Sequence, residues 1–321
     1  MFRTLIAASL TALILCNAGW SQTYPARPVR LVVGFGAGGP DAAARIMAQA
    51  LATQTGQAFV VDNRPGASGA IGADIVAKAP ADGYTLLSAS GTFALLPSVS
   101  RKLPFDVLRD FVPITQVGSS DGFVLIVSPS LAARKVKEML ALARTPSSKI
   151  AFGSNGAGTV GHLVGAAFNA AAKTDMVHVP YKSGAAALNA LMGGEIQILF
   201  ATPALSVPLV KAGKLRALAY EFPTRLSSLP DVPTLAEAGG PVTGIQAGGQ
   251  FMFAPAKIPA ATLARIEAEV RKAVATPETR ERLVNIGLTP VGNSSAETRQ
   301  LFANAVRRYA EVARAAGVEP E

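Results

Sequence analysis

Apolar positions along the chain follow two alternating spacings. Short runs of consecutive apolar residues predict buried β-strands, and longer Ala-rich stretches with apolar residues three or four apart predict helices. The predicted strands cover 29–33, 58–62, 84–89, 123–128, 149–154, 177–181, 196–201 and 215–220, and the predicted helices cover 41–55, 70–79, 134–144, 159–172, 184–194, 261–276, 277–287 and 295–317. This alternation predicts an α/β fold with parallel sheets.

The alternation breaks at two places. Around 110–127 one strand follows another without a helix between them, and around 242–255 a glycine-broken extended segment precedes the last helices. Two such breaks allow the chain to leave one α/β domain, build a second and return. We therefore predict a discontinuous first domain over 23–122 and 246–321 and a second domain over 123–245, with a ligand cleft between them.

The chain begins with a pattern typical of an exported protein. Arg3 supplies a basic start, residues 5–16 form an apolar core, and residues 17–22 are small and polar. The apolar core is shorter than the roughly 20 residues that a membrane-spanning helix needs. Residues 1–22 are therefore expected to be a cleaved signal peptide, with cleavage near Ser21 or Gln22, which predicts a periplasmic protein.

Removal of the signal peptide changes the residue inventory. Cys16 and Trp20, the single cysteine and the single tryptophan, leave with it. The mature chain is then expected to have no disulfide, no thiol nucleophile and no thiolate metal ligand. Lipid attachment to Cys16 is a weaker alternative, because Leu15 is bulky for the position before a lipidated cysteine.

The composition is that of a globular protein with a large aliphatic core. Hydrophobic residues make up 50% of the 321 residues and charged residues 16%, which excludes a disordered chain. The formal charge of +9 falls to +8 when Arg3 leaves. No basic run with interleaved aromatic residues accompanies this charge, so nucleic acid is not an expected partner. The charge favours solubility and mild attraction of small anions.

Two patterns invite an enzymatic interpretation. Ser120 lies in Gly118-Ser119-Ser120-Asp121-Gly122, which matches the G-x-S-x-G turn of hydrolases. That turn must lead from a strand into a helix, whereas the residues after it predict a strand. The chain has two histidines, His162 and His178, and no metal-ligand spacing around either. We therefore expect no catalytic residues and no metal.

The segment 31–46 resembles the start of a dinucleotide-binding domain. Gly34, Gly36 and Gly39 have G-x-G-x-x-G spacing, and Asp62 stands where a ribose-binding carboxylate is expected. Pro40 favours a helix that begins at that residue, which leaves all three glycines in the loop, whereas a dinucleotide fold packs the third inside the helix. An NAD-dependent dehydrogenase is therefore the remote alternative, and no cofactor is expected.

A second reading of this glycine loop is anion binding. Glycine, serine or threonine precedes a predicted helix at 34–41, 90–92, 154–159 and 180–188, where free backbone N–H groups meet the positive end of the helix dipole. Each segment alone is also explained as an ordinary turn or N-cap. Hydrogen bonds to a charged acceptor contribute roughly 1.5–3 kcal/mol each. Several such segments around one cleft would therefore hold a carboxylate without an arginine.

Longer motifs resemble one family of transport proteins. Residues 60–87, 104–118, 178–200, 211–219 and 229–239 are similar to the Bug-type solute-binding proteins of tripartite tricarboxylate transporters. The resemblance implies a type II periplasmic binding protein fold of two α/β domains, which closes around a small carboxylate as a monomer and docks on membrane permease subunits. A ligand sensor that feeds a signalling receptor is the alternative, and permease genes beside this gene would favour transport.

The resemblance also implies the ligand-binding residues. In that family the loop after the first strand, a Gly-Thr segment after the third strand, a Gly-Thr-x-x-His helix start and the end of a middle strand lie around the ligand. These segments correspond here to Phe35, Gly36, Ala37, Gly38, Gly39, Asp41, Ser90, Gly91, Thr92, Ser154, Asn155, Gly158, Thr159, His162, Ala201 and Thr202. For His162 a purely bracing role stays open.

Two departures from the family pattern bear on ligand choice. The first loop of the family commonly reads Pro-Phe-Pro-x-Gly-Gly-Ser-Thr-Asp, whereas residues 34–41 here are one residue shorter and lack the hydroxyl pair. The usual Phe-Asp-Asn is Phe200-Ala201-Thr202 here. Both changes remove polar groups near the expected pocket. We predict a ligand less polar than citrate, or one without an amine, such as an aromatic or aliphatic carboxylate.

Overall fold

A computed structural model describes residues 24–120, 122–145, 148–245 and 248–320. The expected signal peptide lies outside the described residues. Within the described ranges, no helix combines the length and the apolar character that crossing a membrane requires.

The first domain is built on a six-stranded sheet with the order β11-β4-β10-β3-β1-β2. Its strands come from both ends of the chain: β1 (Val29–Val33), β2 (Phe59–Asn63), β3 (Thr85–Ser90), β4 (Phe111–Ser119), β10 (Gln250–Pro255) and β11 (Thr289–Pro290). Side chains of alternate residues enter different cores, since Leu31 and Val33 pack in one hydrophobic cluster and Val32 in the other. Both faces of this sheet are therefore buried at its centre, whereas Val60 of the edge strand β2 is exposed.

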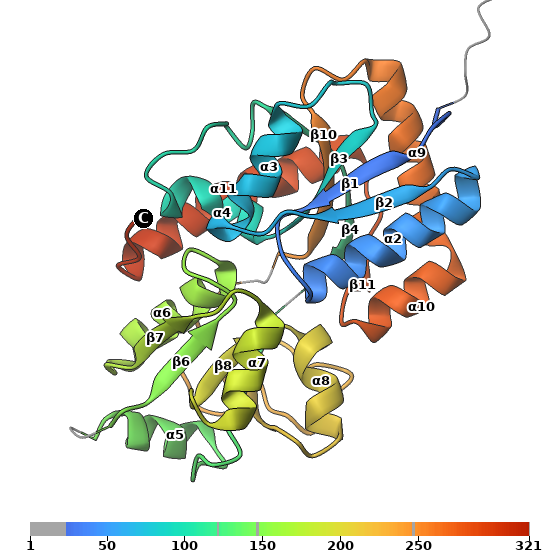
Figure 1. The fold of residues 1–321 in the computed structure, drawn as a ribbon. Helices are drawn as coiled ribbons and strands as arrows, with labels where there is room; N and C mark the ends of the chain where they lie inside the picture. The colour runs from blue at the N-terminus through green and yellow to red at the C-terminus, as the bar shows by residue number, and fades with distance from the viewer. Residues whose placement is uncertain (1–23, 121, 146–147, 246–247, 321) are drawn as a thin grey trace, which may run out of the picture.

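Helices cover both faces of this sheet (Figure 1). The cluster that contains Leu31 is closed by α2 (Gly39–Thr55), α9 (Ala260–Ala275) and α10 (Pro277–Asn285). The cluster that contains Val32 is closed by α3 (Ala70–Ala77), α4 (Thr92–Val99) and α11 (Ser295–Ala315). The result is a three-layer arrangement in which the sheet is the middle layer.

The second domain repeats this design on a smaller scale. Its five strands have the order β7-β6-β8-β5-β9 and are β5 (Phe123–Val127), β6 (Ala151–Ser154), β7 (Val177–Pro180), β8 (Ile198–Ala201) and β9 (Arg216–Glu221). Helices α5 (Val136–Ala143) and α6 (Val160–Ala172) pack on one face, and α7 (Gly184–Gly193) and α8 (Pro203–Lys211) pack on the other.

The expectation of parallel sheets is only partly correct. The pairs β1–β2, β1–β3, β6–β7 and β6–β8 are parallel. However, β10 is antiparallel to both β3 and β4, and β5 is antiparallel to both β8 and β9. Strands β5 and β10 are the first strands after the chain has passed from one domain to the other. No helical crossover within the same sheet precedes them, so they can run antiparallel to their neighbours.

Three local expectations need correction. Helix α2 begins at Gly39, so this glycine lies in the first turn and the helix does not start at Pro40. Helices α4 and α8 were not predicted from the sequence. Each contains an internal proline, Pro97 or Pro208, which lacks a backbone N–H and obscures the helical pattern.

The two breaks in the strand–helix alternation are the places where the chain passes between the sheets. Glu221 holds the second crossing, because its Oε1 accepts hydrogen bonds from the backbone N–H groups of Thr243 at 2.8 Å and Gly244 at 3.0 Å. At the first crossing, a Cβ on Gly122 would lie 2.2 Å from the carbonyl oxygen of Glu221. Only glycine therefore fits at the first crossing beside the end of β9. The domain boundaries at 122/123 and 245/246 stay predictions.

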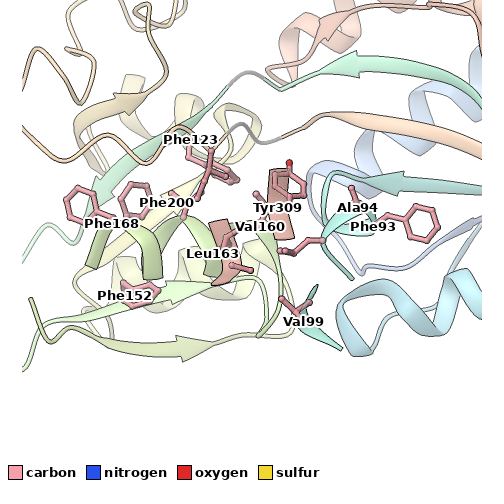
Figure 2. Close-up of a cluster of buried hydrophobic side chains, with 14 of the residues drawn as sticks. Phe93, Ala94, Val99, Phe123, Phe152, Val160, Leu163, Phe168, Phe200 and Tyr309 are labelled. Carbon is pink, nitrogen blue, oxygen red and sulfur yellow. The ribbon is translucent and has the colours of Figure 1, made fainter. Parts of the chain in front are cut away.

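The two domains touch through an apolar contact (Figure 2). Val99 and Tyr309 of the first domain belong to the same buried cluster as Val160 and Leu163 of the second domain. A Cβ on Gly158 would lie only 3.0 Å from Cγ2 of Val99, which shows how closely the loop before α6 approaches α4. The domains are thus packed against each other on one side of the cleft.

Candidate functional site

A cavity of about 90 Å³ lies between the two domains. Segments from both domains form its walls: the loop between β1 and α2, the start of α4, and the starts of α6, α7 and α8. The residues that line it are Phe35, Gly36, Ala37, Gly38, Gly39, Pro40, Ser90, Thr92, Phe123, Asn155, Val160, Gly161, Ser183, Gly184, Leu199, Phe200, Ala201, Thr202 and Leu205. We call this space the ligand cavity.

Helix N-termini converge on the ligand cavity. Gly39 begins α2, Val160 begins α6, Gly184 begins α7, and Thr202 is the N-cap of α8. The first backbone N–H groups of a helix have no intrahelical acceptor, and the helix dipole places partial positive charge there. No ionisable side chain is among the described residues that line the cavity. The described lining thus offers an anion helix dipoles and neutral donors in place of a charged side chain.

The loop between β1 and α2 forms one wall of the cavity and is braced from behind. Asn63 Nδ2 donates to the carbonyl oxygen of Phe35 at 2.9 Å and to Asp41 Oδ1 at 2.8 Å. Asp41 Oδ2 in turn accepts from Arg45 Nε at 3.0 Å. Asp41 lies in the first turn of α2, is 9% exposed and does not line the cavity, whereas residues 35–39 do. The structure thus places Asp41 as a support of the loop.

Close backbone packing fixes the same loop from the other side. A Cβ on Gly34 would lie 2.6 Å from Cα of Gly69, and a Cβ on Gly72 would lie 3.0 Å from Cα of Gly34. Glycines of the turn after β2 are therefore needed for the β1–α2 loop to sit where it does. This contact explains why a glycine-rich 66–72 segment accompanies the first loop in the sequence.

Asp62 has no part in the ligand cavity. It lies in β2, where Oδ2 accepts from Arg30 Nε at 2.7 Å and Oδ1 lies 3.0 Å from Arg64 Nε. Burial acts to raise the pKa of Asp62, but the hydrogen bonds from the two guanidinium groups outweigh it and hold this pKa below its usual range. The Asp62 carboxylate thus pairs with two arginines, which agrees with the absence of a ribose-binding role.

The residues where β3 ends and α4 begins line two different cavities. Ser90 and Thr92 line the ligand cavity, whereas Gly91 lines a separate cavity beside α11. Thr92 Oγ1 also accepts a hydrogen bond from the backbone N–H of Val160 at 3.3 Å, across the domain boundary. The turn after β2 supplies a second link between the domains, because Ser68 Oγ donates to the carbonyl oxygen of Ala157. The predicted Gly-Thr segment therefore also connects the two domains.

The segment between β6 and α6 contributes Asn155 to the ligand cavity and uses its other polar groups internally. Thr159 caps α6 by accepting from the N–H of His162 at 3.3 Å, and Nδ1 of His162 accepts from the N–H of Gly158 at 3.2 Å. Ser154 is 1% exposed and shares a hydrogen bond of 2.7 Å with Nε2 of His178. Ser154, Gly158, Thr159 and His162 are absent from the described lining of the ligand cavity. Ser154, Thr159 and His162 shape the loop that presents Asn155, whereas Gly158 lines a separate cavity together with Asn155.

The rings of His162 and His178 stack, with their centroids 3.9 Å apart. Burial of the His178 ring lowers its pKa to about 4, and the neighbouring His162 acts in the same direction. The unfolded chain, with an ordinary pKa of about 6.5, therefore binds the proton first as the pH falls. We expect this contribution to stability to be complete above pH 6.5 and to be lost between about pH 6.5 and 4. Because the ring is only half-buried, we expect a loss of about 1–2 kcal/mol.

Urea unfolding of the wild type and of His178→Gln between pH 7.5 and 4 measures this loss. The difference in unfolding free energy between the two proteins should shrink as the pH falls, because the variant has no imidazole at that position. Parallel curves over the whole range would show that His178 does not titrate in this way.

Several cavity residues were not predicted from the sequence. Ser183 and Gly184 belong to the 180–188 segment, which resembles an anion-binding loop but was not included among the expected site residues. The apolar lining has no polar signature that would reveal it, since strand and helix patterns place Leu199 or Leu205 in a core equally well. The additional residues are Pro40, Phe123, Val160, Gly161, Ser183, Gly184, Leu199, Phe200 and Leu205.

Two α/β domains that enclose an anion-attracting cavity define the class of two-domain periplasmic binding proteins. Residues 43–318 match the family model described as the tripartite tricarboxylate transporter family receptor. The chain belongs to this family of solute-binding receptors.

Relatives agree with this assignment over nearly the whole chain. Protein BugT of Bordetella pertussis is 32% identical over 302 residues, which cover 93% of this chain and 92% of BugT. The structure of R. palustris Rpa4515 with adipate has a TM-score of 0.86 and 32% identity, and the match covers 93% of this chain and 100% of that one. The structure of the periplasmic binding protein BugD has a TM-score of 0.87 and 28% identity, with the same coverage of 93% and 100%.

These comparisons confirm the main predictions from the sequence. The Bug-type resemblance and the two-domain periplasmic binding protein fold are both confirmed. The family consists of receptors, and a member has been solved with a bound carboxylate, so the non-enzymatic interpretation is confirmed and the dehydrogenase and hydrolase alternatives are wrong.

Proposed function

We propose that this protein captures a small carboxylate in the ligand cavity and presents it to the permease subunits of a tripartite tricarboxylate transporter. The observation that carries the proposal is the convergence of helix N-termini from both domains on a cavity whose described lining has no charged side chain. Backbone N–H groups and the hydroxyl groups of Ser90 and Ser183 supply donors for a carboxylate. Membership of the receptor family supports transport over the sensing alternative.

The same lining supports a ligand with an apolar body. Phe35, Phe123, Leu199 and Leu205 line the cavity, and no described lining residue offers a carboxylate to pair with an ammonium group. An amino acid would therefore lose the hydration of its ammonium group without gaining an ion pair. We propose an aliphatic or aromatic carboxylate without an amine, in the size range of the adipate bound by the R. palustris relative.

The sequence and the family support a periplasmic setting. The N-terminal 22 residues have the pattern of a signal peptide, and the relative BugD is a periplasmic binding protein. We propose that the mature chain acts as a monomer in the periplasm and that the domains close on the ligand before docking on the permease.

A thermal-shift screen of the mature chain tests this function. A ligand that binds only the folded state raises its stability by about 2.7 kcal/mol at 100-fold excess over Kd, which for a chain of this size corresponds to about 5 °C. Adipate, hexanoate or benzoate should raise the melting temperature by this amount, and aspartate should raise it less. Failure of the whole carboxylate panel would overturn the proposed function. If aspartate raises the melting temperature more than every carboxylate without an amine, the proposed ligand class is overturned.

A further inference from the structure

A second, smaller cavity continues from the ligand cavity. It has a volume of about 60 Å³ and is lined by Gly39, Pro40, Ser90, Ser120, Thr202, Ala204, Gly249, Gln250, Ile286, Gly287 and Leu288. Gly39, Pro40, Ser90 and Thr202 line both spaces, so the two are contiguous. We call the smaller cavity the side chamber.

Two hydroxyl groups at the side chamber are buried without a hydrogen-bond partner. Ser120 is 6% exposed, and its Oγ has no partner among the described residues. Thr202 is partly exposed as a residue, but its Oγ1 is buried and likewise has no partner among the described residues. Buried polar atoms are paired in the great majority of cases, so two such hydroxyls beside one cavity indicate that a partner is supplied by something that enters it.

The position of Thr202 strengthens this interpretation. Thr202 is the N-cap of α8 but makes no side-chain capping bond, whereas Ser183 at the same position of α7 accepts from the N–H of Ala186 at 3.1 Å. A Cβ on Gly39 would lie 3.7 Å from Thr202 Oγ1, so this hydroxyl points across the cleft towards α2. The hydroxyl thus faces the shared wall of the two cavities and is not used by its own helix.

The rest of the side chamber is mostly apolar. Pro40, Ala204, Ile286 and Leu288 supply hydrocarbon, and no described lining residue carries a charge. A carboxylate in this space would lose its hydration without a cation to compensate. An uncharged group that forms hydrogen bonds, such as a hydroxyl or a carbonyl, would satisfy both orphan hydroxyls without that cost.

We propose that the side chamber binds the far end of the ligand and selects for an uncharged hydroxyl or carbonyl group there. This rests on the proposed function: the carboxylate lies in the ligand cavity, an apolar spacer leads past Gly39 and Ser90, and the polar end meets Ser120 and Thr202. Ser120, whose surroundings resemble a hydrolase turn in the sequence, thereby becomes a specificity-determining residue. The substrate class is an ω-hydroxy or keto monocarboxylate.

Calorimetric titration with three six-carbon ligands tests the proposal: hexanoate, 6-hydroxyhexanoate and adipate. The hydroxy acid should bind most tightly, because hexanoate leaves both hydroxyls unpaired and adipate places a second charge in the chamber. Ser120→Ala should weaken binding of 6-hydroxyhexanoate by about 5- to 10-fold and leave hexanoate unchanged. The free Ser120→Ala protein should melt no lower than wild type, because the variant removes an orphan buried hydroxyl.

Further variants separate a specific effect on ligand binding from a general effect on folding. Thr202→Val should act like Ser120→Ala, whereas Thr202→Ser should retain the preference for the hydroxy acid. Ser130→Ala, whose hydroxyl pairs with Ser128 in the second domain, is the matched control and should change neither affinity. If adipate or hexanoate binds as tightly as the hydroxy acid, or if Ser120→Ala weakens all three ligands equally, the side-chamber proposal is overturned while the proposed function stands. If no carboxylate binds, both are overturned.

Discussion

Replacing Ser183 with aspartate is expected to weaken carboxylate binding by about 30-fold or more. Ser183 lines the ligand cavity and caps α7, where its hydroxyl accepts from the N–H of Ala186. Aspartate is as good an N-cap as serine, so the helix is retained. The new charge, however, repels an anion in a cavity whose described lining has no cation. Two like charges ~8 Å apart at an effective dielectric constant of ~20 repel by about 2 kcal/mol, which corresponds to about 30-fold in Kd.

Ser183→Asn is the matched neutral control for this charge. Asparagine has nearly the same size and caps helices equally well, so it should change the affinity by less than about threefold. Calorimetry with the best carboxylate of the screen measures both variants. An equal loss in the two would indicate a steric effect and would contradict electrostatic recognition of an anion at the N-terminus of α7.

Replacing Phe93 with alanine is expected to lower the free energy of unfolding by about 3–5 kcal/mol, the usual cost of deleting a buried aromatic ring. Phe93 is 4% exposed, and its ring centroid lies 5.0 Å from that of Phe111, 5.1 Å from that of Phe253 and 5.4 Å from that of Phe302. The ring therefore joins α4, the sheet and α11 directly beneath the cleft wall that carries Thr92.

Urea unfolding of the purified protein measures this loss. Phe93→Leu should cost less than half as much, because leucine fills most of the space. Leu301→Ala, at a side chain that is 46% exposed, should change stability by less than about 0.5 kcal/mol. A loss below about 1.5 kcal/mol for Phe93→Ala would contradict the view that this aromatic cluster is the centre of the first domain's core.

Much of the fold is readable from the sequence because its elements are separated by clear turn signals. The apolar runs predict β1, β2 and β3 within about one residue of their ends, and the Ala-rich periodicity predicts α9 equally well and α2 except for its first two residues. The direction of β5 and β10 is not readable, because the same apolar run suits a buried parallel or antiparallel strand. Helices α4 and α8 escape detection because Pro97 and Pro208 interrupt patterns that are already short.

Site residues are predictable from the sequence where their position at the end of a strand already places them at the cleft. The glycine loop at 35–39 follows β1, Ser90 ends β3, and Asn155 follows β6, and all three line the ligand cavity. Whether a polar residue faces the cavity or supports the loop depends on contacts between distant segments, such as Asn63 with Asp41. The side chamber is even harder to predict from the sequence, because Ser120, Gly249 and Leu288 come from three separate parts of the chain and share no motif.

The absence of ionisable side chains from the described cavity lining has a consequence for the physiology of uptake. Backbone amides and hydroxyl groups keep the same charge between about pH 5 and 9, so the receptor does not change its own preference as its surroundings acidify. Affinity then follows the dissociation of the solute alone. We therefore expect a protein built in this way to bind only the ionised form of a weak acid.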